Sequence, residues 1–132
     1  MKPIICMLLF SLSFFSISCS NVSPDAVDLK VDFNWQGLVP CTPGGNPEIR
    51  ISGIPADTDV LAVTLYDHGM SHGKQFLNYD GSGIIRQGAL DKIEGPCPAI
   101  ASGKYRFKIE AVNTEKVIIG IGSKERYFPE EE

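Results

Sequence analysis

Apolar and polar residues alternate along much of the chain after residue 26, and this pattern predicts β-strands. From 27 to 35 every second side chain is apolar, with charged or amide residues between them. A period of two places one side of a strand in a core and the other side in solvent. The same alternation returns at 105–111 and, over a shorter length, at 49–51.

The segment 60–66 is apolar on both faces, as is typical of a strand in the middle of a sheet. The sequence predicts a last strand at 117–121, or two strands, the second at 126–128. Glycine- and proline-rich turns separate these segments, and no stretch beyond residue 26 has a helical period. The sequence therefore predicts an all-β domain at 27–128, an antiparallel β-sandwich with little or no helix.

The first 18 residues have the features of a secretory signal peptide. Lys2 precedes a run without any charge from 4 to 17, and small residues follow at 18–20. A basic start, a short apolar run and a small-residue cleavage region are typical of such a signal. The run is shorter than the ~20 residues needed to cross a bilayer core. We therefore expect an exported protein.

Cys19 is the expected site of lipid modification, because lipoprotein signals of bacteria place a cysteine directly after a small residue such as Ser18. Ser16 stands where such signals usually have leucine, so ordinary cleavage near 18–20 and a periplasmic or secreted product remain an alternative. Each buried acyl methylene contributes about 0.8 kcal/mol to membrane binding. A lipidated Cys19 would hold the domain on the periplasmic side of the cell envelope, through a tether at 19–26.

The charge of the chain disfavours nucleic acid as a partner. The chain has 16 acidic residues against 12 basic ones, a formal net charge of −4, and it ends in an acidic tail at 129–132. Binding to phosphate backbones needs clustered lysine and arginine.

Two of the four cysteines are expected to form a disulfide. Cys6 lies in the signal peptide and Cys19 is the lipidation site, which leaves Cys41 and Cys97, each in a loop rich in proline and glycine. Two thiols in an oxidising compartment usually pair. Closing a loop of this length contributes roughly 4 kcal/mol in the chain-entropy model. No C-x-x-C pair exists, so zinc is not expected.

The polar residues most suited to chemistry lie at the end of the central strand, at 66–73. Asp67 comes at its exit, and His68 and His72 follow in a glycine-rich segment that we expect to be a loop. Gly69 and Gly73 disfavour the helix that would bring both histidines to one metal, and no G-x-S-x-G nucleophile elbow is present. We predict no metal, no cofactor and no catalytic residue. An ordinary solvated loop is the alternative.

Five short motifs in order resemble the phosphatidylethanolamine-binding proteins, in their bacterial, Raf kinase inhibitor-like branch. They are CTPGGN at 41–46, SGIP at 52–55, LAVTLYD at 61–67, GPCP at 95–98 and GKYRF at 103–107. The family has C-x-G-x-N, W-x-G-x-P, an apolar strand leading into D-P-D-A-P, G-P-C-P and G-x-H-R-Y. The resemblance covers roughly residues 33 to 112.

The resemblance implies a β-sandwich with a small anion pocket at one end, which in relatives accepts phosphate or a phosphorylated head group. The positions it implies for ligand binding are Asp67, His72, Gly95, Pro96, Pro98, Tyr105 and Arg106. The sequence departs from the family where His68 and Gly69 replace the Pro-Asp of D-P-D-A-P, and where Tyr105 replaces a histidine.

Three functions remain open from the sequence. The leading hypothesis is a non-enzymatic, membrane-anchored protein that binds a small anionic or phosphorylated ligand. The alternative is an envelope protein–protein interaction module that has lost the pocket, with an unknown partner. A third is a hydrolytic or metal-using enzyme built on Asp67, His68 and His72.

Overall fold

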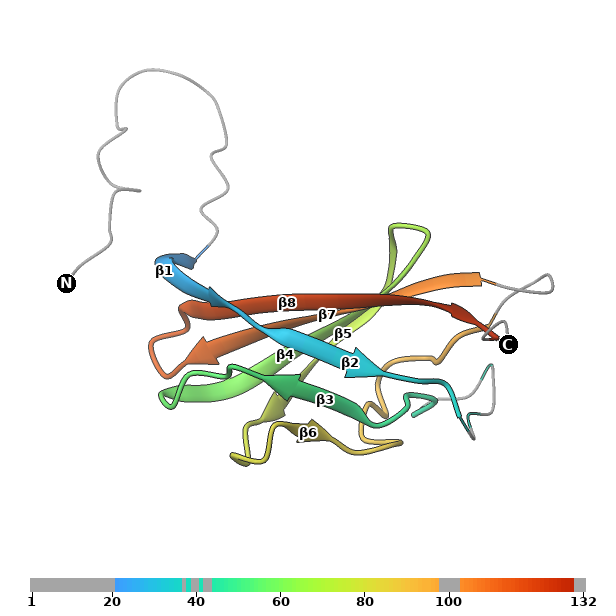
Figure 1. The fold of residues 1–132 in the computed structure, drawn as a ribbon, viewed down its shortest axis with the longest axis horizontal. Helices are drawn as coiled ribbons and strands as arrows, with labels where there is room; N and C mark the ends of the chain where they lie inside the picture. Colours follow the sequence, from blue (N-terminus) through green and yellow to red (C-terminus); the bar gives the residue numbers. More distant parts are fainter. Residues whose placement is uncertain (1–20, 37, 39–40, 42–43, 98–102, 130–132) are drawn as a thin grey trace, which may run out of the picture.

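A computed structural model describes residues 21–36, 38, 41, 44–97 and 103–129 of the protein. These residues form eight strands and no helix, which confirms the all-β prediction (Figure 1). The strands are β1 (Val22–Asp28), β2 (Lys30–Phe33), β3 (Ile49–Ser52), β4 (Thr58–Asp67), β5 (Met70–Asn78), β6 (Ile84–Ile85), β7 (Gly103–Asn113) and β8 (Ile118–Phe128). Within the described ranges no helix could span a membrane.

The strands form two sheets. One has five strands in the order β1-β8-β7-β4-β5, and the other has three in the order β2-β3-β6. All neighbouring strands are antiparallel except β1 and β8, which run parallel, so the prediction of a purely antiparallel fold is wrong at this one ladder. Parallel strands need a long connection, and here nearly the whole domain lies between the two.

The continuous alternation at 27–35 is divided between two strands that belong to different sheets. β1 pairs with β8, whereas β2 pairs with β3, and the change of sheet takes place at Leu29. The Leu29 amide still donates to the Ile121 carbonyl at 2.9 Å. β1 also begins at Val22, inside the segment expected to be a tether. Pro24 is tolerated there because β1 lies at the edge of its sheet.

One hydrophobic core lies between the sheets, and both contribute to it. Its buried members are the inward residues of the alternating segments: Leu29, Val31, Phe33, Trp35, Ile49, Ile51, Leu61, Val63, Leu65, Ile85, Leu90, Ile93, Tyr105, Phe107, Ile109 and Ala111. The Phe33 and Phe107 rings meet edge to face across it, with centroids 5.1 Å apart. Residues 61–65 of β4 are all buried, as predicted for a central strand.

The sequence prediction was wrong for β5, which occupies the segment expected to be a loop. His72 and Gly73 lie within this strand, directly after a tight turn. Glycine and histidine have low strand propensity, but pairing with the strongly apolar β4 overrides it. β8 is one continuous strand from Ile118 to Phe128, so both alternatives were wrong: the strand neither ends at 121 nor divides in two, because it pairs with β7 along its whole length.

The β4–β5 turn and the start of β7 lie at one end of the molecule, and the start of β1 lies at the other (Figure 1). The disulfide links the loops at the first of these ends.

Candidate functional site

The β4–β5 hairpin brings Asp67 and His72 together. Its two central turn residues, His68 and Gly69, both have positive φ, 47° and 83°, as in the two-residue turns that match the twist of a hairpin. The His72 Nε2 atom lies 3.4 Å from Asp67 Oδ2. Both side chains are partly buried, with 29% of His72 and 26% of Asp67 exposed. A protonated His72 therefore forms an ion pair with Asp67.

The other oxygen of the carboxylate, Asp67 Oδ1, is buried and accepts no hydrogen bond. His68 Nε2 lies 3.5 Å away, but this contact does not have hydrogen-bond geometry and the His68 side chain is 67% exposed. A buried carboxylate oxygen without a donor is costly, since it loses water and gains nothing in exchange. This oxygen therefore lacks a hydrogen-bond donor in the structure.

Tyr105 forms the inner wall beside Asp67, its register partner on β7. The side chain is fully buried, and its ring lies edge-on to His72 with centroids 6.2 Å apart. The Tyr105 hydroxyl accepts a hydrogen bond from the Cys97 amide at 3.0 Å. Burial raises the pKa of the Tyr105 phenol, the Cys97 bond lowers it in part, and the charge of Asp67 raises it further. The phenol therefore stays neutral and keeps its own hydrogen to donate.

The loop at 95–97 packs against the outer side of Tyr105, and the predicted disulfide holds it in place. Cys41 and Cys97 are bonded, with Cα atoms 4.5 Å apart, and the Cys41 amide donates to the Pro96 carbonyl at 3.0 Å. A Cβ at Gly95 would lie 2.6 Å from the Gly45 carbonyl oxygen, so only glycine fits there. Pro98 lies outside the described residues, as does Cys19.

We call Asp67, His72 and Tyr105 the Asp67 cluster. Of the other predicted site residues, Gly95 and Pro96 directly precede Cys97, whose amide donates a hydrogen bond to the Tyr105 hydroxyl of the cluster. Arg106 does not join it. Neighbouring residues of a strand point to opposite faces, and the Arg106 guanidinium stacks on the Tyr66 ring at 4.6 Å on the other side of the sheet.

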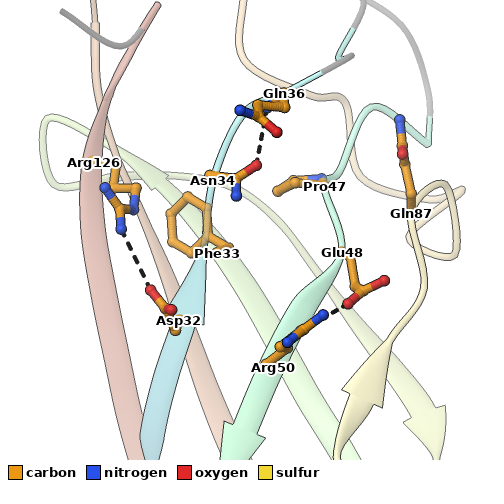
Figure 2. Close-up of a pocket in the computed structure, with 9 residues that line it drawn as sticks. All are labelled: Asp32, Phe33, Asn34, Gln36, Pro47, Glu48, Arg50, Gln87 and Arg126. Carbon is orange, nitrogen blue, oxygen red and sulfur yellow. Dashed lines mark hydrogen bonds and ion pairs between the residues drawn. The ribbon is translucent and has the colours of Figure 1, made fainter. Parts of the chain in front are cut away.

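A second polar region, which the sequence did not predict, is a groove of about 420 Å³ across β2, β3 and β8 (Figure 2). It is lined by Asp32, Phe33, Asn34, Gln36, Pro47, Glu48, Arg50, Gln87 and Arg126. Its charges lie in two pairs, Arg50 Nε to Glu48 Oε1 at 2.9 Å and Arg126 Nη2 to Asp32 Oδ1 at 3.4 Å. The Asp32 side chain is 65% exposed and that of Arg50 74%, so water already solvates these pairs.

The described residues contain no group of three or more histidine, cysteine or carboxylate side chains placed to hold a metal ion. No protein-family model matches the chain, and no curated protein matches it either.

Proposed function

We propose that this protein is an exported binding protein that holds a small phosphorylated ligand at the Asp67 cluster. The observation that carries the proposal is the unsatisfied, buried Asp67 Oδ1 beside the His72 imidazole. Buried polar atoms without partners are uncommon in folded proteins, and a bound ligand is one way in which such an atom gains its hydrogen bond.

Two side chains of the cluster offer bonds to a ligand, and the fully buried Tyr105 supports them from behind. A protonated His72 is a donor, which suits phosphate oxygens, while Asp67 is an acceptor. The ligand should therefore combine an anionic group with a hydrogen-bond donor. Phosphoethanolamine has both, and so does a phosphate monoester in its singly protonated form. This class agrees with the ligands implied by the resemblance to phosphatidylethanolamine-binding proteins.

The same cluster does not favour an enzyme. Tyr105 is engaged with the Cys97 amide, and the Ser71 hydroxyl, which lies between the two histidines in sequence, accepts a bond from the Gly73 amide at 3.3 Å. A nucleophile needs a base within hydrogen-bond reach. Binding without chemical change is therefore the function proposed.

Export and a lipid anchor at Cys19 are part of the proposal. The charge-free run at 4–17 and Ser18 support it, and a disulfide is compatible with an oxidising compartment. Metabolic labelling with a radioactive fatty acid tests the anchor, with Cys19→Ala as the variant and Cys6→Ala as the control. Label on the wild type and on Cys6→Ala, but not on Cys19→Ala, is expected. Equal labelling of all three proteins would contradict a lipid at this position.

Titration calorimetry with phosphate and with phosphoethanolamine tests the ligand. His72→Ala should weaken binding at least tenfold, because it removes a charged donor worth about 1.5–3 kcal/mol. His68→Ala is the matched control, since it also neighbours Asp67 but is largely exposed, and it should change affinity less than twofold. Equal effects of the two substitutions, or no heat with either ligand, would contradict the proposal; the second result would favour an interaction module.

A further inference from the structure

The outer face of the five-stranded sheet, which points away from the core, carries paired aromatic and basic side chains. Leu65 and Phe107 are buried in the core, so their neighbours along β4 and β7 point outward. Three cation–π pairs stand on this side: Arg106 on Tyr66 at 4.6 Å, Lys74 on Phe76 at 5.4 Å and Lys104 on Tyr127 at 5.9 Å. We call these six residues, together with Lys108, the outer-sheet face.

Two of the three aromatic members are unusually open to solvent. Phe76 is 63% exposed and Tyr127 is 53% exposed. Large apolar side chains gathered on one face mark an interaction surface more often than isolated ones do. Aromatic rings beside lysine or arginine are also characteristic of proteins at the membrane–water interface, where the rings sit at head-group level and the cations face phosphate.

The outer-sheet face is basic, although the chain as a whole is acidic with a net charge of −4. Across β4, β5 and β7 it presents four cations, and the one outward carboxylate on these strands, Glu110, is ion-paired with Lys74 at 3.3 Å. On β8, Glu125 pairs with Lys104 at 3.1 Å. Arg106 and Lys108 are the two cations left over, so four cations face two carboxylates on these strands. An excess of positive charge on one face favours contact with an anionic surface.

We propose that the outer-sheet face docks on an anionic phospholipid bilayer. Phe76 and Tyr127 would enter the head-group layer, and Arg106 and Lys108 would contact lipid phosphates. Each lysine or arginine close to an anionic membrane strengthens binding by about fivefold. The cations and rings are spread over β4, β5, β7 and β8, which suits a planar partner better than a small ligand.

The position of the chain start supports a membrane as the partner, and this part of the argument rests on the proposed lipid anchor. Asn21 is two residues beyond Cys19, and two extended residues span at most about 7 Å. An acylated Cys19 would therefore hold the β1 edge of the sheet against the lipid. Because β1 belongs to the five-stranded sheet, the short segment after Cys19 is long enough for the outer-sheet face to lie on the bilayer.

Vesicle co-sedimentation of the chain from Ser20 to Glu132 tests the proposal without any lipid anchor. All eight strands, the core and the disulfide lie within this piece. We expect binding to vesicles containing about one-third phosphatidylglycerol, and at least tenfold weaker binding to pure phosphatidylcholine. Equal binding to both vesicles, or to neither, would overturn the proposal. So would preference for a single-stranded oligonucleotide over the anionic vesicles.

Charge reversal identifies the face. Arg106→Glu with Lys108→Glu should weaken binding to anionic vesicles about thirtyfold or more. The matched control is Arg50→Glu with Arg86→Glu, which makes the same change in net charge at exposed positions of the other sheet region. The affinity of the control variant for anionic vesicles should fall less than threefold. Equal losses of affinity in both variants would overturn the proposal. Far-UV circular dichroism verifies that each variant is folded.

The aromatic residues are tested separately. Phe76→Ser with Tyr127→Ser should lower vesicle binding about tenfold while leaving the net charge unchanged. Binding unchanged in this variant would rule out insertion of the rings. Calorimetry with phosphoethanolamine on the Arg106, Lys108 variant separates the two proposals, because the Asp67 cluster lies on the opposite face and should retain its affinity.

Discussion

The Asp67 cluster and the polar groove of Figure 2 both place carboxylates beside basic side chains, but they differ in burial and in the structure that supports them. The Asp67 side chain is 26% exposed and has a buried oxygen without a donor, whereas Asp32 is 65% exposed and sits in water. Behind Asp67 stand the buried Tyr105 and a disulfide-linked loop. Burial and rigid backing, rather than the presence of charges, make a polar cluster capable of selective binding.

The disulfide should give the largest effect, because it supports only the Asp67 end of the molecule. Replacing both cysteines, Cys41→Ser with Cys97→Ser, should lower the free energy of unfolding by about 4 kcal/mol. The 56-residue separation between the two cysteines sets this value through loop-closure entropy. Urea denaturation measures it. A loss below about 1 kcal/mol would show that the loop is held without the bond.

Removing the Tyr105 hydroxyl should have the next largest effect. Tyr105→Phe keeps the ring but leaves the Cys97 amide without its acceptor, at a cost of about 1–2 kcal/mol in the free energy of unfolding. Tyr79→Phe is a suitable control, since the structure gives that hydroxyl no such backbone bond. Similar losses in both variants would mean that the Cys97 contact contributes little.

The same tyrosine should make stability depend on pH in the alkaline range. Burial raises the pKa of Tyr105 in the folded protein above its usual value of 10.0. The folded state therefore holds this proton more tightly, so its contribution is complete below pH 10 and is lost as pH rises through the folded pKa. Urea midpoints measured between about pH 9 and pH 11 should fall more steeply for the wild type than for Tyr105→Phe. Parallel curves would contradict the assignment.

Matched removal of one charge separates the two regions in ligand binding. Asp67→Asn should weaken phosphoethanolamine binding about tenfold, or about 1.4 kcal/mol, because an amide in that place loses the charged acceptor. Asp32→Asn in the groove should leave that affinity within about twofold. Calorimetry on both variants makes the comparison. A larger effect of Asp32→Asn would place the ligand in the groove.

The smallest effect is expected inside the groove itself. Glu48→Gln breaks the 2.9 Å pair with Arg50, but both side chains are largely exposed. The free energy of unfolding should change by less than about 0.5 kcal/mol, as is usual for a solvated surface pair. Thermal denaturation at low and high salt measures it. A loss above about 1 kcal/mol would show that the groove is more rigid than its exposure indicates.

The alternating pattern was sufficient to predict the all-β fold, and the cysteine count was sufficient to predict the disulfide. The alternating pattern did not predict the change of sheet at Leu29, because an unbroken alternation is the same for one long strand as for two consecutive strands. β5 was missed because Gly69 and Gly73 resemble loop residues. The sequence does contain a signal for a β-hairpin here. His68 and Gly69 both tolerate positive φ, and they lie between an apolar strand and the segment Gln75–Leu77.

The residues of the Asp67 cluster were predicted in two ways: Asp67 and His72 from their place in one segment, and Tyr105 from the family resemblance alone. Asp67 and His72 lie in one hairpin, so a local motif could bring attention to them. Sequence reasoning could have excluded Arg106 from the site. A residue next to the inward Tyr105 on the same strand must point outward. The groove combines Asp32, Arg50 and Arg126 from distant strands, and no local pattern contains that arrangement.

The most direct test of the Asp67 cluster is an NMR titration that follows the imidazole resonances of the two histidines while phosphoethanolamine is added. Both histidines flank Asp67, so each serves as the reference for the other. The proposed binding mode predicts a saturable shift of the His72 resonances with His68 little changed, and a shift in Asp67→Asn that needs about tenfold more ligand. Equal shifts of both histidines, or none at millimolar ligand, would contradict the central claim that this cluster is a binding site.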